Sequence, residues 1–238
     1  MRYNEGVFRR LRKHPETESS MTKKKQDRCR LVLIVPDMAD AAEQARVLGD
    51  ALRGGDVASV IIPQYGLDDA TFQKHAELLV PVIQEAGAAA LIVDNSRVAG
   101  RVKADGLHIS GNSAALAEAV GNHTPKMIVG GGNAMDRHHA LEMGEAQPDY
   151  IFFGRLDGDI KPEAHSKNIA LGEWWSAMIA IPCIVMGGID PSSAVVVAES
   201  GSEFVALGKA VFDDPATAAT IVSQVNAELD EKAPRFED

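Results

Sequence analysis

Two short glycine-containing segments in the last quarter of the chain could bind a phosphate group. Gly187 and Gly188 follow one apolar run, and Gly208 and Lys209 follow the next one. Glycine lets main-chain N–H groups approach an anion closely, a following helix adds partial positive charge, and a lysine adds a full charge. The alternative is that these glycines only form tight turns. We predict a phosphate-binding site where the two segments meet.

Other polar residues also follow apolar runs and so are candidates for chemistry. Asp94 and its neighbours follow the run 89–93, and residues 154–168 form the longest irregular stretch, which predicts a mobile loop. Asp94 has a structural alternative, because a carboxylate here could cap a helix beginning near Ser96. His108 lies within an apolar run and is either a packed core residue or a catalytic one.

Predicted strands and helices alternate regularly along the chain, and most of the candidate residues lie where the strands end. Eight short apolar runs predict buried parallel strands at residues 31–35, 57–62, 89–93, 106–109, 127–129, 150–153, 183–186 and 204–207. Segments of helical period lie between and after them, at 41–52, 70–85, 97–102, 114–120, 135–143, 172–178, 192–199 and 215–229. Eight such units predict a single-domain α/β fold, the (β/α)8 TIM barrel. An open dinucleotide-binding sheet is less consistent, because no glycine motif follows the first run.

The composition narrows the classes of function. Acidic residues outnumber basic ones by 34 to 24, and the net charge of −10 argues against nucleic acid as a partner. No apolar run approaches the ~18 residues that a transmembrane helix needs, so we expect no membrane association. The two cysteines, Cys29 and Cys183, show no metal-binding spacing and indicate reduced thiols, which favours a cytoplasmic location.

The N-terminal segment differs from the rest of the chain. Residues 1–30 contain ten basic and four acidic residues, without an apolar period. We predict a disordered basic leader over residues 1–28 and the barrel domain over residues 29–238. Either Met1 or Met21 could be the start of translation, and the sequence leaves open whether the protein forms a homo-oligomer.

Several motifs together resemble the thiamine-phosphate synthase and thiazole tautomerase superfamily, over residues 31–212. They are Asp94, the segment Ala-Asp-Gly-Leu-His-Ile at 104–109, the glycines at 130–132, Lys-Pro-Glu-Ala at 161–164, and the block from 182–190 to Gly208. The resemblance implies a TIM barrel and a transferase of thiamine biosynthesis. Such an enzyme joins a hydroxymethylpyrimidine pyrophosphate to a thiazole phosphate and releases pyrophosphate, with Mg²⁺ as cofactor.

The resemblance also assigns roles to individual residues. It places Asp94 on a magnesium-binding aspartate and Lys161 on a lysine that contacts pyrophosphate. Arg155 is the further cation that we assign to pyrophosphate. The thiazole phosphate is assigned to Gly187, Gly188 and Gly208, with Lys209 adding its charge. The expected ligands are therefore small phosphorylated molecules.

The chain departs from the family pattern at four places. The motif Gln-x-Arg-x-Lys after the second strand aligns with either residues 61–65 or residues 64–68, and neither register contains the Arg or the Lys, so two cations are missing. Ser113 replaces a second magnesium aspartate, and Gly132 replaces a serine. The tautomerase histidine is absent from residues 133–135. Two hypotheses follow: a divergent synthase, or a non-catalytic barrel that binds a phosphorylated ligand after loss of the pyrophosphate site.

Overall fold

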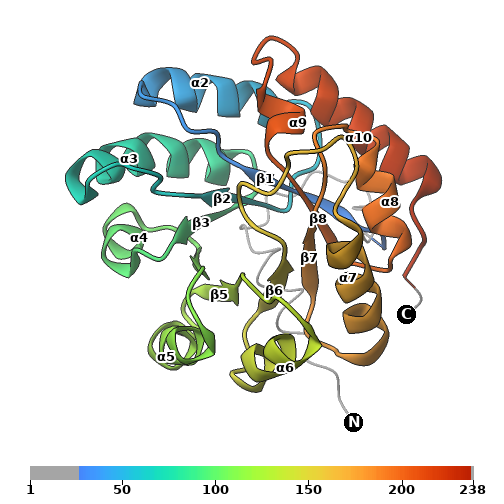
Figure 1. Ribbon diagram of the computed structural model, residues 1–238. Helices are drawn as coiled ribbons and strands as arrows, with labels where there is room; N and C mark the ends of the chain where they lie inside the picture. Colours follow the sequence, from blue (N-terminus) through green and yellow to red (C-terminus); the bar gives the residue numbers. More distant parts are fainter. Residues whose placement is uncertain (1–26, 237–238) are drawn as a thin grey trace, which may run out of the picture.

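A closed barrel of eight parallel strands forms the centre of the molecule, with helices around it (Figure 1). The computed structural model describes residues 27–236. The strands are β1 (Arg30–Ile34), β2 (Ser59–Ile62), β3 (Ala89–Val93), β4 (Gly106–Ile109), β5 (Ile128–Gly131), β6 (Tyr150–Phe153), β7 (Cys183–Met186) and β8 (Phe204–Leu207). Strand β8 pairs with β1, for example Leu33 with Leu207, which closes the barrel. The predicted TIM barrel is confirmed.

The helices lie outside the barrel and follow the strands in chain order. They are α2 (Ala41–Leu52), α3 (Asp69–Glu85), α4 (Ser96–Val102), α5 (Ser113–His123), α6 (Arg137–Glu145), α7 (Ser166–Met178), α8 (Ser193–Glu199), α9 (Lys209–Phe212) and α10 (Ala218–Lys232). None of these helices is long and apolar enough to cross a membrane.

The strands are apolar throughout because both of their faces are buried. In β1, Leu31 and Leu33 belong to the layer between the strands and the helices, whereas Val32 and Ile34 fill the barrel interior. All four are at most 2% exposed. Successive strand side chains point to opposite faces, so a strand that packs on both sides loses the polar alternation of a half-exposed strand. This packing fixes the strand ends from which the loops of the site emerge.

Several element boundaries differ from those predicted by the sequence. Strand β5 continues into Gly130 and Gly131. Position 130 requires glycine, because a Cβ there would lie 2.2 Å from the Tyr150 ring. Helix α7 begins at Ser166 rather than residue 172, and the His165 ring accepts a hydrogen bond from the Lys167 N–H. The short helix α9 was not predicted as a separate element.

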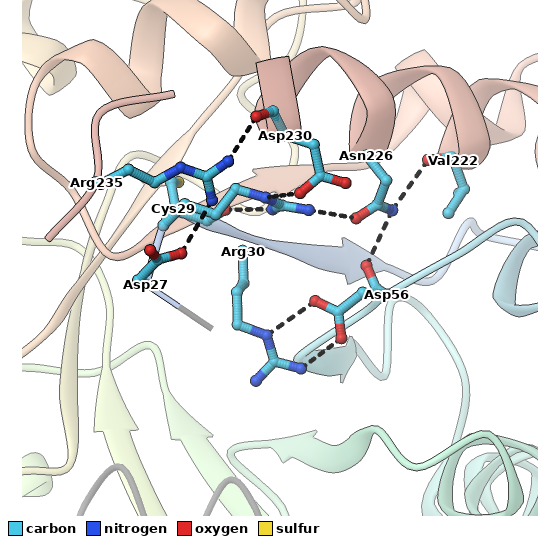
Figure 2. A network of polar contacts seen from close by, with 9 residues as sticks. Asp27, Cys29, Arg30, Asp56, Val222, Asn226, Asp230 and Arg235 are labelled. Atoms are coloured by element: carbon cyan, nitrogen blue, oxygen red, sulfur yellow. Dashed lines mark hydrogen bonds and ion pairs between the residues drawn. The ribbon is translucent and has the colours of Figure 1, made fainter. Parts of the chain in front are cut away.

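The opposite end of the barrel, where the strands begin, holds a network of charged side chains. Of the predicted leader the structure describes only Asp27 and Arg28. The buried Arg28 guanidinium donates to Asp230 (2.8 Å) and to Asn226 (3.2 Å) on α10. Arg235 pairs with Asp27 at 2.9 Å (Figure 2). These contacts join the two ends of the described chain beneath the barrel. The prediction of disorder covers residues 1–28, of which residues 1–26 lie outside the described part, whereas Asp27 and Arg28 make the contacts given above.

Candidate active site

The two glycine segments lie next to each other at the carboxyl ends of β7 and β8. These strands pair in parallel, with Met186 opposite Ala206, and the Gly187 N–H continues the ladder to the Ala206 carbonyl at 2.9 Å. We call Gly187, Gly188, Gly208 and Lys209 the phosphate cradle. The structure therefore brings together the residues predicted to bind a phosphate. TIM-barrel enzymes place their active sites at this end.

The loop between β6 and α7, residues 154–165, covers this cradle. In Figure 1 it is the gold segment that runs from β6 towards α9. Its main-chain carbonyls accept hydrogen bonds from the end of β7: Lys161 O accepts from the Ile189 N–H (2.8 Å), and Pro162 O accepts from the Asp190 N–H (3.0 Å). The fit is close, because a Cβ on Gly188 would lie 2.1 Å from Pro162 O. Glycine at position 188 is therefore required by this close approach.

Asp159 of the same loop reaches the end of β8. Its carboxylate oxygen Oδ2 accepts a hydrogen bond from the Lys209 N–H at 2.5 Å, and the residue is 2% exposed in an otherwise mostly exposed loop. Burial raises the pKa of this carboxyl group, although the Lys209 N–H and ammonium group oppose the rise. Sequence analysis missed Asp159, because one acidic residue among several in a polar loop carries no signal of what it contacts.

Asp94 is fixed at the end of β3 by Ser110 rather than by a helix. Its carboxylate accepts a hydrogen bond from the Ser110 N–H at 2.8 Å and another from the Ser110 hydroxyl. The cap of α4 is Asn95, whose side chain accepts from the Val98 N–H at 3.0 Å. The alternative role of Asp94 as a helix cap is therefore wrong. What remains is a carboxylate held in one orientation, with its backbone in the left-handed region at φ 55°.

The fit of magnesium to this end of the barrel rests on Asp94. Among residues 27–236, no group of three His, Cys, Asp or Glu side chains is arranged to hold a metal ion. Mg²⁺ commonly takes one or two protein carboxylates and completes its shell with water and substrate phosphates. The oriented Asp94 carboxylate fits such an ion, held mainly by oxygens of the substrate. It does not fit an ion bound by protein alone.

The end of β2 contains no cation, consistent with the sequence departure at 64–68. Instead, the Tyr65 hydroxyl donates to the Val35 carbonyl at 2.5 Å. Gln64 donates to the Asp69 carboxylate at 3.0 Å and accepts from Asn95. Burial raises the pKa of Tyr65, and the charges of nearby aspartates, including Asp159, add to the rise. This corner of the site is therefore a hydrogen-bonded cluster that includes the Asp69 carboxylate and has no cation after β2.

The two predicted pyrophosphate cations both lie on the 154–165 loop. Arg155 makes a two-pronged ion pair with Asp157, at 3.0 and 2.9 Å, and both side chains are well exposed. The Lys161 residue is also exposed. An exposed ion pair contributes little to stability, so Arg155 can exchange Asp157 for another anion at small cost.

His108 points into the barrel interior beneath this end. It is 1% exposed, and its Nδ1 lies 2.8 Å from the Tyr150 hydroxyl. Burial lowers the pKa of His108 to about 4, although Asp94 favours the charged form. The imidazole is therefore neutral at physiological pH, and its surroundings support the interpretation as a packed core residue.

Comparison with known proteins places this chain in a family. Residues 31–211 match the family model described as thiamine monophosphate synthase. A thiamine-phosphate synthase of Rhodospirillum centenum is 32% identical over 83% of this chain and 96% of its own length. One of Hyphomonas neptunium is 30% identical over 87% of this chain and 96% of its own.

A solved structure is similar in fold. A thiamine phosphate pyrophosphorylase from Pyrococcus furiosus superimposes with a TM-score of 0.69 at 18% identity, covering 85% of this chain and 96% of that one. At this identity the likeness concerns the fold alone. The family match, in contrast, spans all eight strands and the loops that carry the candidate site. The chain belongs to the thiamine monophosphate synthase family.

Proposed function

We propose that this protein is a thiamine-phosphate synthase, which joins hydroxymethylpyrimidine pyrophosphate to a thiazole phosphate. In this reaction the bond between the pyrimidine methylene carbon and pyrophosphate breaks, and the electron pair leaves with pyrophosphate. The thiazole nitrogen then forms the new bond to that carbon. The observation that carries this proposal is the family match over residues 31–211, which includes every strand of the barrel.

The thiazole phosphate is proposed to bind at the phosphate cradle. Main-chain N–H groups at the ends of β7 and β8 would donate to its oxygens, and the exposed Lys209 would supply a full positive charge. The placement of these residues at one end of two paired strands supports this assignment. Gly188 leaves no room for a side chain there, so the donors are main-chain groups.

Lys161 and Arg155 are proposed to bind the pyrophosphate. Both extend from the 154–165 loop, next to the cradle, and both are exposed. A departing pyrophosphate gains negative charge in the transition state, and positioned cations stabilise that charge. Because the cations after β2 are missing, we assign Lys161 and Arg155 the larger share of this task.

Asp94 is proposed to hold the magnesium ion, together with oxygens of the substrate. When bound, Mg²⁺ would neutralise part of the charge of the pyrophosphate group. Asp94 itself needs no rearrangement, because Ser110 already fixes its carboxylate. A cytoplasmic location and a homo-oligomeric state stay predictions.

A turnover assay tests the proposal. The full chain is incubated with both substrates and Mg²⁺, and the release of pyrophosphate and the formation of thiamine phosphate are measured. We expect turnover in the wild type and a loss of about 100-fold or more in Asp94→Asn, on the scale of a lost charge-stabilising group. Asp40→Asn is the matched control, because Asp40 caps α2 and asparagine caps a helix equally well. Absence of Mg²⁺-dependent pyrophosphate release from the wild type would refute the assignment.

A further inference from the structure

The hydrogen-bond donors of the phosphate cradle and its surroundings already have acceptors within the chain. The Gly188 N–H donates to the Ser193 hydroxyl at 2.9 Å. The next two N–H groups, of Ile189 and Asp190, donate to carbonyls of the 154–165 loop. The Lys209 N–H donates to the carboxylate of Asp159 on that loop. A phosphate group placed here would need the same donors.

Asp159 also occupies the space that an anion would need. A Cβ on Gly208 would lie 3.0 Å from Asp159 Oδ2, so the carboxylate lies directly over the glycine. Its charge and its geometry as an acceptor are those of a phosphate oxygen. Two such anions cannot share one main-chain donor, and like charges at this distance repel each other.

The loop is attached to this surface in a way that allows release. Its hydrogen bonds to the ends of β7 and β8 are made by two carbonyls and one carboxylate, and Ile160 beside Asp159 is 71% exposed. Burial makes the charged form of Asp159 less favourable than in water, as its raised pKa indicates. The contact therefore has a solvation cost that an outward movement of the loop would remove.

We propose that the 154–165 loop is an autoinhibitory strap, in which Asp159 occupies the place of the substrate phosphate. A phosphate ester binds only when it displaces the Asp159 carboxylate from the Lys209 N–H. This inference rests on the proposed phosphate cradle and goes beyond it, because it assigns a competing internal ligand. The same displacement moves Arg155 and Lys161, so binding of the first phosphate repositions the cations assigned to pyrophosphate.

The affinity for a phosphate probe tests the strap. Inorganic phosphate and thiazole phosphate are titrated separately into the full chain by calorimetry, for the wild type, Asp159→Ala and Asp159→Asn. A competing internal ligand reduces the apparent affinity by the fraction of molecules in the open state. We expect Asp159→Ala to bind either probe about tenfold more tightly than the wild type. Asp159→Asn keeps the shape without the charge and should fall between the two.

Asp157→Asn is the matched control, since Asp157 is an exposed aspartate of the same loop and bonds to Arg155 rather than to the cradle. It removes the same charge, so a purely long-range effect would change the affinity equally in both variants. We expect less than about a threefold change in this control, because exposed charges are screened. An equal gain in the control and in Asp159→Asn would overturn the proposal.

Trypsin cleavage after Arg155 provides a second measurement that does not depend on affinity. Lys161 precedes a proline, so Arg155 is the informative site within the loop. We expect saturating thiazole phosphate to accelerate this cleavage in the wild type and to have little effect in Asp159→Ala, whose strap is already released. If the wild type and Asp159→Ala bind the probes equally, and thiazole phosphate leaves the cleavage rate of the wild type unchanged, the strap is overturned even if turnover is observed. If Asp159→Ala binds the probes more tightly but the wild type shows no turnover, the strap is supported and the synthase reaction is refuted.

Discussion

The two ends of the barrel use similar interactions for different purposes. At the end where the strands begin, Arg28 and Arg30 make side-chain ion pairs with Asp230 and Asp56 at 2.8 and 2.7 Å (Figure 2 shows the Arg30 pair). At the end where the strands finish, the 154–165 loop is held mainly through main-chain N–H groups of the barrel. The side-chain network is satisfied by its own members, whereas a main-chain N–H group can donate to any suitable anion.

This difference bears on the proposal that ligands bind where the strands finish. At the beginning of the strands, Arg28 is buried and donates to Asp230, Asn226 and the Cys29 carbonyl, so its removal would leave unpaired groups. At the other end, the N–H groups of Ile189, Asp190 and Lys209 donate to acceptors of the loop, which the proposed phosphate would replace. We therefore expect substitutions at the first end to change stability and those at the second to change binding.

The largest effect is expected at Gly188. In Gly188→Asp, the new Cβ meets Pro162 O, and the carboxylate adds negative charge where the phosphate would lie. We expect a loss of thiazole phosphate affinity of about 100-fold or more, since a like charge is unfavourable in a partly desolvated site. Calorimetric titration measures this loss.

Two controls separate the effect of the added charge on affinity from the effect of displacing the loop. Gly188→Ala also displaces the loop but adds no charge, so it should retain binding better than Gly188→Asp. Gly121→Asp adds the same charge on α5, where a Cβ meets nothing within 4 Å, and should bind as the wild type does. Equal affinity in Gly188→Asp and wild type would mean that the glycines only form turns.

The second largest effect is a loss of stability at the end of the barrel where the strands begin. Arg28→Ala removes a 4% exposed guanidinium and leaves Asn226 and the Cys29 carbonyl without one partner each. We expect a loss of about 2–4 kcal/mol in the free energy of unfolding, as for other buried charged networks that lose one member. Urea denaturation measures it, and turnover per folded molecule should stay unchanged.

An exposed pair from the same network is the matched control. Arg235→Ala breaks the ion pair with Asp27, whose side chains are 45% and 48% exposed. We expect a loss of less than about 1 kcal/mol, because solvent screens exposed pairs. Comparable losses in both variants would contradict the claim that burial makes Arg28 important.

The smallest effect is expected in the pH dependence of Asp159→Asn. The folded pKa of Asp159 lies above its ordinary value of 3.8, so the charged form costs stability at neutral pH. This cost disappears as the pH falls through the folded pKa. Lys209 opposes this rise in pKa, whereas Asp213 on the far side of α9 adds to it.

We therefore expect Asp159→Asn to be as stable as the wild type, or slightly more stable, at pH 7. The difference should shrink as the pH falls through the raised pKa of Asp159, where the native carboxyl group binds its proton. Thermal unfolding at several pH values measures this. A variant that becomes less stable than the wild type at pH 7 would show that the carboxylate holds the loop in place rather than competing for the cradle.

The sequence was sufficient for the barrel because each strand is a short continuous apolar run that is buried on both faces. It also placed Gly188 and Gly208 correctly, since the ends of consecutive strands in a barrel lie side by side. It could not predict the contact between Asp159 and Lys209, which are 50 residues apart and come together only through the course of the loop. The sequence left open whether Asp94 caps a helix, because its tertiary partner Ser110 cannot be found from local capping preference.

We expect phosphorylated substrates to bind where the strands of the barrel end and not where they begin. Hydrogen–deuterium exchange of the full chain, with and without saturating thiazole phosphate, tests it most directly. We expect slower exchange at residues 187–190 and 208–209, faster exchange in the 154–165 loop, and no change at residues 27–30 or 226–236. Ligand-dependent changes at residues 27–30 and 226–236, with none at 187–190, would contradict the account.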